Sequence, residues 1–501
     1  MKLILTSLLL SLGFLSASAA DKPNIIVIYS DDQGYGDASC LNPDSKFKTP
    51  NLDRLAAEGV TFTDGHCSDT VCTPSRYGLL TGRYNWRTTL KKGVYGAEKE
   101  CLIADGRMTL ASLLRDNGYE TAMVGKWHLG MDFPGEWGNR DWTKPVKDMP
   151  LDKGFDYFWG IPASMNYGVL AWFEGRFAEV PPTQYTRKKP NKIAISDYRI
   201  MPPYQKEPLK KDDLEVAPDF SDSECLTRFT DKSIEWIQGK AEAAKNGKPF
   251  FLYLPYTSPH KPVIPLEKFR GQGEAGAYGE FMIETDWYVG RILKMLDETG
   301  LAENTMIVYS SDNGPETTWK ERIKKFDHHS NGIYREGKRS IYEGGHRVPF
   351  FVRWPAKVEG GREINGTVCQ TDLLATFAEM LGTNLPNEAG EDSVSFYSSI
   401  IDPKAEVSPR PPLIMHGANG RFAIRDGKWK LVMETKKKNE KRELYDLSVD
   451  PGEAKNVLSD NPEVEKRLVA AITKIVEDGR STAGEAKGND TPHWDDLVWM
   501  K

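Results

Sequence analysis

Short, uninterrupted apolar runs alternate with amphipathic segments along most of the chain. The runs cover residues 24–29, 249–253, 305–309 and 348–352. Continuous runs rich in β-branched and aromatic residues are typical of strands buried on both faces, as in a parallel sheet between helices. Helical patterns lie between or beside them, at residues 50–58, 109–117, 229–245, 278–299 and 372–381. This alternation predicts an α/β domain with a mostly parallel central sheet between helices.

The pattern changes near residue 409. Residues 421–432 contain two strand-like runs around Asp426-Gly427, which is a hairpin signal. Residues 461–477 have the period of an amphipathic helix. We therefore expect a large domain over residues 21–408, followed by a small subdomain over residues 409–501 with an antiparallel sheet and a helix.

Residues 133–218 show little periodicity and are rich in Pro, Trp, Tyr, Gly and charged residues. We interpret this stretch as long insertions around a pocket, not as a separate domain. Long ordered loops usually have a functional reason. Substrate selection is the role that we expect here.

The first twenty residues have the pattern of a secretory signal peptide. Lys2 supplies a positive start, residues 3–15 are mostly apolar, and Ala17-Ser18-Ala19 is a small-residue cleavage site. The apolar run is too short for a membrane span. We expect an exported protein, periplasmic or secreted, with no membrane anchor.

The composition narrows the possible partners. The net charge of -6 argues against nucleic-acid binding, although a local cluster of cations can still bind an anionic substrate. Six cysteines in an exported protein would permit three disulfides, but the sequence does not show a pairing.

The segment from Cys72 to Arg76 combines three features that suit an anion. The spacing places Cys72 and Arg76 on one face of a first helical turn, and Pro74 suits the opening of a helix. Backbone N–H groups at a helix start point toward an anion. A sulfur nucleophile and a guanidinium there would make a site for a tetrahedral oxyanion ester. The alternative is a buried cysteine before an ordinary helix.

Acidic residues follow two of the predicted strands. Asp31 and Asp32 follow the run at 24–29, and Asp312 and Asn313 follow the run at 305–309. Ligands of open α/β sheets bind beyond the carboxyl ends of the strands, and oxygen side chains suit a hard divalent cation such as Ca²⁺. The alternative is that these residues cap helices.

Six segments together resemble, in the same order, the signatures of type I sulfatases, the formylglycine-dependent branch of the alkaline phosphatase superfamily. The resemblance runs from Pro23 into the C-terminal region and implies that residues 21–408 are a sulfatase catalytic domain. The segments are Ser30–Asp37, Cys72-Thr73-Pro74-Ser75-Arg76 with Leu79-Leu80-Thr81-Gly82, Gly125–Gly130, Ser258-Pro259-His260, Ser311–Gly314, and Gly337-Lys338 with Tyr342–Gly345.

The resemblance implies one Ca²⁺ ion and a modified cysteine. Its metal ligands would be Asp31, Asp32, Asp312, Asn313 and the residue at position 72. A thiolate is a poor ligand for Ca²⁺, and the family oxidises this cysteine to Cα-formylglycine with a maturation enzyme. One hydroxyl of the hydrated aldehyde attacks sulfur, and the second then expels sulfate. Five cysteines would remain, enough for at most two disulfides. Asp37, in the first segment, is interpreted as structural.

The resemblance also implies roles for cations and histidines. Arg76 would orient formylglycine, while Lys126 and Lys338 would hold the sulfate, where cations favour the transition state. His128 would assist sulfate elimination, and His260 would protonate the leaving alcohol or bind sulfate.

Two assignments stay open at this point. An alignment slip could replace Lys338 by one of its basic neighbours, Lys324, Lys325 or Arg339. A group of polar residues before Lys338 could contact the sugar of a substrate or could be solvated. This group is Asp327, His328, His329 and Asn331.

The expected function is hydrolysis of a carbohydrate sulfate, because the aromatic-rich insertions could frame a sugar. Among possible substrates, the overall character of the sequence favours 6-O-sulfated galactose or N-acetylgalactosamine. One alternative is a phosphate or phosphonate ester hydrolase of the same superfamily. His260 and the lysines stand where such enzymes bind a second metal, which favours sulfate. A second alternative is an inactive protein that binds sulfated glycans.

Overall fold

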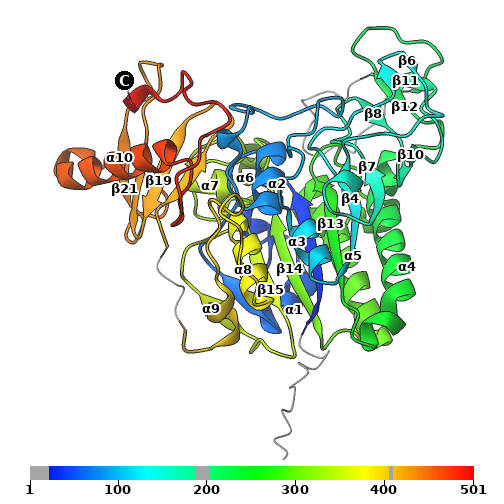
Figure 1. The fold of residues 1–501 in the computed structure, drawn as a ribbon, viewed down its shortest axis with the longest axis horizontal. Coiled ribbons are helices and arrows are strands. Elements are labelled where there is room, and N and C mark those ends of the chain that lie inside the picture. The colour runs from blue at the N-terminus through cyan, green and yellow to red at the C-terminus, as the bar shows by residue number, and fades with distance from the viewer. Residues whose placement is uncertain (1–21, 188–202, 406–409, 501) are drawn as a thin grey trace, which may run out of the picture.

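A ten-stranded sheet forms the centre of the large domain (Figure 1). The computed structural model describes residues 22–187, 203–405 and 410–500. Five neighbouring strands, β7, β4, β13, β1 and β14, run parallel to one another. The α/β prediction with a mostly parallel sheet is therefore confirmed. In sheet order the strands are β10 (Phe177–Ala178), β9 (Phe173–Glu174), β7 (Tyr157–Ile161), β4 (Glu120–Lys126), β13 (Phe250–Pro259), β1 (Asn24–Asp31), β14 (Thr305–Ser311), β15 (Phe350–Arg353), β2 (Val60–Phe62) and β16 (Arg362–Ile364).

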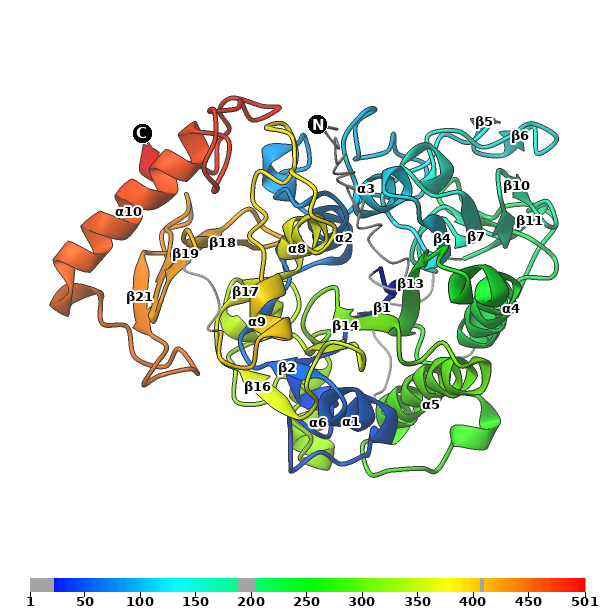
Figure 2. The ribbon, with the colours of Figure 1, turned by 60° about the horizontal axis from the view of Figure 1, so that its bottom comes forward.

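Helices cover both faces of this sheet (Figure 2). Helices α1, α4 and α5 pack together on one face, and α2, α3 and α8 pack on the other. Every residue of β1, β13 and β14 is buried as a result, which explains their continuous apolar runs. The helices of the large domain are α1 (Pro50–Ala57), α2 (Cys72–Thr81), α3 (Leu110–Asp116), α4 (Cys225–Lys245), α5 (Gly276–Thr299), α6 (Trp319–Phe326), α7 (Glu343–His346), α8 (Leu373–Met380) and α9 (Tyr397–Ile401).

The stretch at residues 133–218 differs in part from the predicted insertions. Within its described residues, β7 pairs with β4 and extends the central sheet, and β9 and β10 continue it. A smaller sheet contains β8 (Val169–Leu170), β11 (Gln184–Thr186) and β12 (Leu214–Val216). Most of these strands have only two or three residues, too few to leave a period in the sequence. Two further pairs are β5 (Gly135–Glu136) with β6 (Asn139–Arg140), and β3 (Gly65–His66) with β17 (Val368–Cys369).

The C-terminal subdomain has the predicted antiparallel sheet and helix. Its strands, in spatial and chain order, are β18 (Leu413–His416), β19 (Phe422–Asp426), β20 (Trp429–Val432) and β21 (Glu443–Asp446). The hairpin between β19 and β20 turns at Gly427, whose φ of 56° lies in the left-handed region that favours glycine. Helix α10 (Pro462–Glu477) packs against β19 and β20.

The subdomain shares its hydrophobic core with the large domain. Tyr84 and Trp86, which follow α2, lie in the same buried cluster as Phe422, Leu431 and Trp494. The rings of Trp86 and Phe422 meet edge to face at 5.3 Å. Hydrophobic packing therefore continues from the large domain into the sheet that begins with β18.

All six cysteines lie within the described residues, and none of them forms a disulfide. Cys40 is exposed and the other five are buried, so none of the disulfides that the even count permits is present in this structure. Among the described helices, none combines the length and the apolarity that crossing a membrane requires.

Candidate functional site

The four predicted metal-binding side chains meet at the carboxyl ends of two adjacent strands. Asp31 ends β1 and Asp32 follows it, while Asp312 and Asn313 follow β14. The Asp32 backbone N–H donates to Asp312 Oδ1 at 3.1 Å, and Asn313 Nδ2 donates to Asp32 Oδ1 at 2.8 Å. All four residues are buried. The parallel pairing of β1 with β14 is what brings them together.

Two oxygens of this group have the placement expected of ligands to a cation. Asp32 Oδ2 and Asn313 Oδ1 are buried and have no hydrogen-bond partner. A buried oxygen without a partner is costly, and carboxylate and amide oxygens are preferred ligands of hard divalent cations. One ligand atom from each of Asp31, Asp32, Cys72 and His260 lies within 4.8 Å of the others. These residues therefore fit a metal ion.

Cys72 is the first residue of α2 and lies against the acidic group. Its Sγ is 3.5 Å from Asp31 Oδ1 and 3.8 Å from Lys338 Nζ. Burial raises the pKa of the Cys72 thiol, and Asp312 raises it further, against the opposing effect of Lys126 and Lys338. The unmodified side chain is therefore a neutral thiol, which is a poor nucleophile and a poor ligand for a hard cation.

Arg76 lies one helical turn after Cys72 and is fully buried. Its Nη2 donates to Asp312 Oδ2 at 2.8 Å, and its Nη1 donates to the Lys126 carbonyl oxygen at 3.2 Å. The side chain thus ties the start of α2 to the ends of β14 and β4. This placement agrees with a role in orienting residue 72.

Two lysines reach the carboxylates from opposite parts of the chain. Lys126, the last residue of β4, pairs with Asp31, and Lys338 Nζ lies 2.5 Å from Asp32 Oδ1. Burial raises the pKa of Asp31, but Lys126, Arg76 and Lys338 lower it more, so the carboxyl group stays ionised. The structure thus places Lys338, and not Lys324 or Lys325, in the site, because those two are exposed on α6.

A close backbone contact holds the segment that carries Lys338. A Cβ added at Gly314 would lie 1.9 Å from the Gly344 carbonyl oxygen. Glycine is therefore required where the loop after Asn313 meets α7, which follows Lys338 in the chain. This contact brings two of the sequence motifs side by side.

Both predicted histidines border the site and are held neutral. Nε2 of His128 donates to the Tyr95 carbonyl oxygen at 3.0 Å, so Nδ1, which is buried and has no partner, carries the lone pair. Burial, Lys126 and Arg76 lower the pKa of His128. His260 follows β13, with Nε2 3.7 Å from Asp32 Oδ2. Burial lowers the pKa of His260 to about 3. Asp32 opposes this shift, whereas Lys338 and Lys126 lower the pKa as well.

The group before Lys338 separates into buried and surface residues. His328 is buried and its Nε2 donates to Asp37 at 2.8 Å, so a sugar contact does not hold for this ring. Asn331 is also buried. Asp327 and His329 pair with each other at the surface, at 3.6 Å. Asp37, enclosed by these contacts, has the structural placement that we expected.

One buried side-chain hydrogen bond beside the site has no signal in the sequence. His416 Nδ1 lies 2.7 Å from Asp69 Oδ2, and both side chains are 1% exposed. The Asp69 carbonyl oxygen accepts a hydrogen bond from Ser75 Oγ at 2.9 Å, inside the first turn of α2. The C-terminal strand β18 thereby supports the segment that leads to Cys72. Spacing could not reveal this pair, since 347 positions separate its partners.

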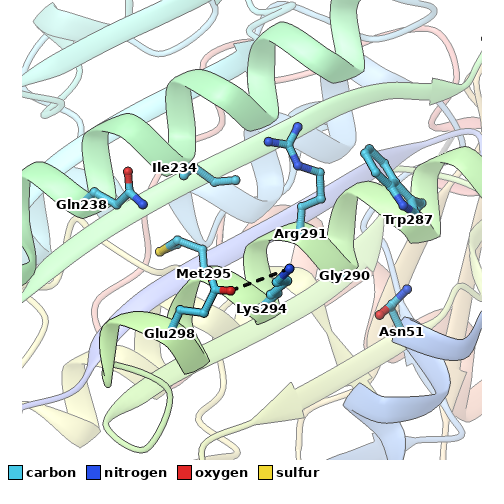
Figure 3. A pocket seen from close by; sticks show the side chains of 9 residues that line it. All are labelled: Asn51, Ile234, Gln238, Trp287, Gly290, Arg291, Lys294, Met295 and Glu298. Carbon is cyan, nitrogen blue, oxygen red and sulfur yellow. Dashed lines mark ion pairs between the residues drawn. The ribbon is translucent and has the colours of Figure 1, made fainter.

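A groove of about 500 Å³ lies between α4 and α5, away from these residues (Figure 3). Trp287, Arg291 and Met295 contribute to its lining, and Lys294 and Glu298, one turn apart on α5, pair at 3.7 Å. None of its lining residues belongs to the acidic group, so the groove is not the site described above.

Comparison with known proteins gives concordant matches. Residues 23–383 match a family model described as Sulfatase. An N-acetylgalactosamine-6-O-sulfatase of Bacteroides thetaiotaomicron is 32% identical over 498 residues, which cover 91% of this chain and 93% of that protein. Human arylsulfatase A is 31% identical over 476 residues, covering 90% and 86%. A solved 6S-sulfatase structure, from work on the metabolism of multiple glycosaminoglycans by Bacteroides thetaiotaomicron, superposes with a TM-score of 0.78 at 32% identity, covering 91% and 99%.

Proposed function

Because this chain belongs to the sulfatase family, we propose that it hydrolyses sulfate esters of carbohydrates, releasing inorganic sulfate and the sugar alcohol. The observation that carries this proposal is the buried group at the ends of β1 and β14, flanked by Lys126 and Lys338. We further propose 6-O-sulfated N-acetylgalactosamine or galactose as the substrate. The match to an N-acetylgalactosamine-6-O-sulfatase over nearly its whole length supports this choice.

The family uses a metal ion and a formylglycine made from cysteine. We propose that the ion is Ca²⁺, held by Asp31, Asp32, Asp312, Asn313 and the modified residue 72. The oxygen donors and the two unpartnered oxygens support a hard cation. When both groups are present, they supply a metal-activated hydroxyl as the nucleophile toward sulfur.

The chain's own residues have complementary tasks in this proposal. Lys126 and Lys338 neutralise the sulfate oxygens, and Arg76 fixes the orientation of residue 72. His260 supplies a proton to the leaving oxygen, and a bound sulfate anion beside it raises the pKa of this imidazole above its value in the free protein. His128 accepts a proton at Nδ1 during sulfate release, since Nε2 is committed to the Tyr95 carbonyl oxygen.

The alternative activity, on phosphate or phosphonate esters, is not favoured. Matched aryl sulfate and aryl phosphate substrates test the choice directly, with the enzyme produced alongside a formylglycine-generating enzyme. We expect sulfate release to dominate by kcat/KM, and peptide mass spectrometry to detect formylglycine at position 72. Dominant phosphate release would overturn the proposal.

We also propose that residues 1–20 direct export to the periplasm or the medium, and that the exporting cell supplies the maturation enzyme. The charged start, the apolar run and the small-residue cleavage site support export. Amino-terminal sequencing of the protein recovered outside the cytoplasm tests this. A chain that still begins at Met1 would contradict it.

A further inference from the structure

An ion pair between Glu316 and Arg339 lies at the edge of the buried site. Arg339 Nη1 and Nη2 reach Glu316 Oε1 and Oε2 at 2.5 and 3.0 Å, a two-pronged arrangement of matched planar groups. Arg339 directly follows Lys338, and Glu316 lies three residues after Asn313. Both partners are therefore anchored next to residues of the site.

Further hydrogen bonds hold each partner. The Arg339 N–H donates to the Thr70 carbonyl oxygen at 2.9 Å, and Glu316 Oε1 accepts a hydrogen bond from the Thr317 N–H at 2.8 Å. Arg339 has a φ of 76°, a left-handed conformation that non-glycine residues seldom adopt. The fold thus holds this arginine in place despite backbone strain.

The pair lies between the buried charges of the site and the solvent. The Arg339 side chain is 46% exposed and that of Glu316 is 12% exposed, whereas that of Lys338 is 4% exposed. Glu316 Oε2 also lies 3.8 Å from Lys261 Nζ, directly after His260. The pair therefore lies on the His260 side of the site.

Position and chemistry together suggest what the pair contacts. If His260 protonates the leaving oxygen, the sugar released with that oxygen lies on the same side as Glu316 and Arg339. A carboxylate accepts hydrogen bonds from hydroxyl groups, and a guanidinium donates to hydroxyl oxygens. Held side by side, the two groups match neighbouring hydroxyls of a sugar ring, which an aryl leaving group lacks.

We propose that Glu316 and Arg339 bind hydroxyl groups of the leaving sugar and thereby select carbohydrate sulfates over aryl sulfates. This inference rests on the proposed sulfatase function and deepens it. It makes the pair a specificity determinant that contacts the part of the substrate remote from sulfur.

The test compares two substrates on two variants, Glu316→Gln and Arg339→Asn. Asparagine tolerates the left-handed conformation at position 339, so that substitution removes the guanidinium without adding strain. We expect kcat/KM for N-acetylgalactosamine 6-sulfate to fall by about 10- to 100-fold in each variant. With 4-nitrophenyl sulfate, we expect a change of less than about threefold, because no hydroxyl contact is lost.

A matched control is Glu336→Gln, which removes a carboxylate that pairs with exposed Lys320 at 3.3 Å. This variant should retain wild-type activity on both substrates. Equal losses on both substrates in the Glu316 and Arg339 variants would show that the pair acts by positioning Lys338 or His260, and would overturn the proposal. Unchanged activity on the sugar substrate would also overturn it. A wild-type enzyme that cleaves neither ester would overturn the proposed function itself, before any variant is compared.

Discussion

Charge balance is the organising feature of the site at the scale of single residues. Three buried carboxylates each contact a buried cation: Asp31 meets Lys126, Asp32 meets Lys338, and Asp312 meets Arg76. Buried charges are tolerated when they are paired in this way. A divalent cation among them would make the site net positive, which is the condition for holding an anionic ester. Metal binding and substrate binding are therefore expected to depend on each other.

Asn313→Ala removes one of the two unpartnered oxygens. We expect metal affinity to fall about tenfold, which lowers the metal-dependent stabilisation by about 1.4 kcal/mol at a fixed Ca²⁺ concentration well above both dissociation constants. Thermal unfolding with added Ca²⁺ and with chelator measures this difference. Equal Ca²⁺-induced shifts in the wild type and the variant would contradict Asn313 as a ligand.

Cys72→Ser provides one hydroxyl group at position 72, whereas a hydrated formylglycine provides two. We expect this variant to accept the sulfuryl group and to fail in its release, so that steady-state turnover falls by at least about 10³-fold. Intact-protein mass spectrometry after incubation with substrate should show an increase of one sulfuryl group. Cys72→Ala serves as the control that cannot gain mass. Sustained turnover by the serine variant would rule out the need for an aldehyde hydrate.

Glu284, a buried residue of α5, should make stability depend on pH. Burial raises its pKa to about 7, although its carboxylate accepts a hydrogen bond from the Leu266 N–H. The folded state therefore keeps this proton at a pH where the unfolded chain, with a pKa of about 4.3, has lost it. Its contribution is fully present below about pH 4 and is lost as pH rises to about 7.

Glu284→Gln removes this titration. Between about pH 4.5 and 7.5 the wild type should lose up to about 3 kcal/mol of stability more than the variant. Unfolding midpoints in denaturant across this range provide the comparison. Parallel pH profiles for the two proteins would show that Glu284 titrates normally.

At the scale of elements, the sequence predicted those strands whose burial is uniform. β1 and β14 are apolar along their length and end at acidic residues. Both the strands and the site at their ends could therefore be predicted from the sequence. β4 was not predicted, because Thr121 and Gly125 interrupt its apolar character. The run at residues 348–352 indicated a strand but not its direction, and β15 is antiparallel to β14. Direction depends on the connection between strands, which periodicity does not encode.

The order of the motifs identified the site residues from the sequence. It did not show which side chains pair with one another. Lys338 could be separated from Lys324 and Lys325 only by its contact with Asp32. The pairs Asp69–His416 and Glu316–Arg339 connect segments that carry no shared pattern. Such contacts follow from the packing of whole elements.

His416→Ala tests whether β18 supports the start of α2. The substitution leaves the Asp69 carboxyl group buried without the hydrogen bond to His416, which we expect to cost about 3 kcal/mol of stability. Activity should fall by the same factor on sugar and aryl sulfates, because the affected group is the segment that carries Cys72. His493→Ala, at an exposed histidine, is the control. Wild-type melting temperature and activity in His416→Ala would exclude this supporting role.

At the scale of the whole molecule, the two architectures behave as one packing unit. The core of the C-terminal subdomain includes Tyr84 and Trp86 of the large domain. Ion pairs also cross the boundary: Arg83 Nη2 lies 2.9 Å from Asp490 Oδ1, and Lys430 Nζ lies 2.9 Å from Glu343 Oε1. Neither part therefore completes its core without the other.

We accordingly expect a single cooperative thermal transition, with loss of activity coinciding with loss of C-terminal structure. Differential scanning calorimetry and the fluorescence of the thirteen tryptophans, which include Trp86 and Trp494, should give coincident midpoints. Two resolved calorimetric transitions would contradict the shared core.

The shared core also sets a rule for recombining this protein with its relatives. A chimera that exchanges the chain only after residue 409 would place a foreign sheet against Tyr84 and Trp86, two aromatic rings stacked on each other at 5.5 Å. The crossover that preserves this packing must carry the segment after α2 together with the C-terminal sheet. The unit to exchange therefore consists of two segments that are far apart in the sequence. A chimera joined only at residue 409 would separate them.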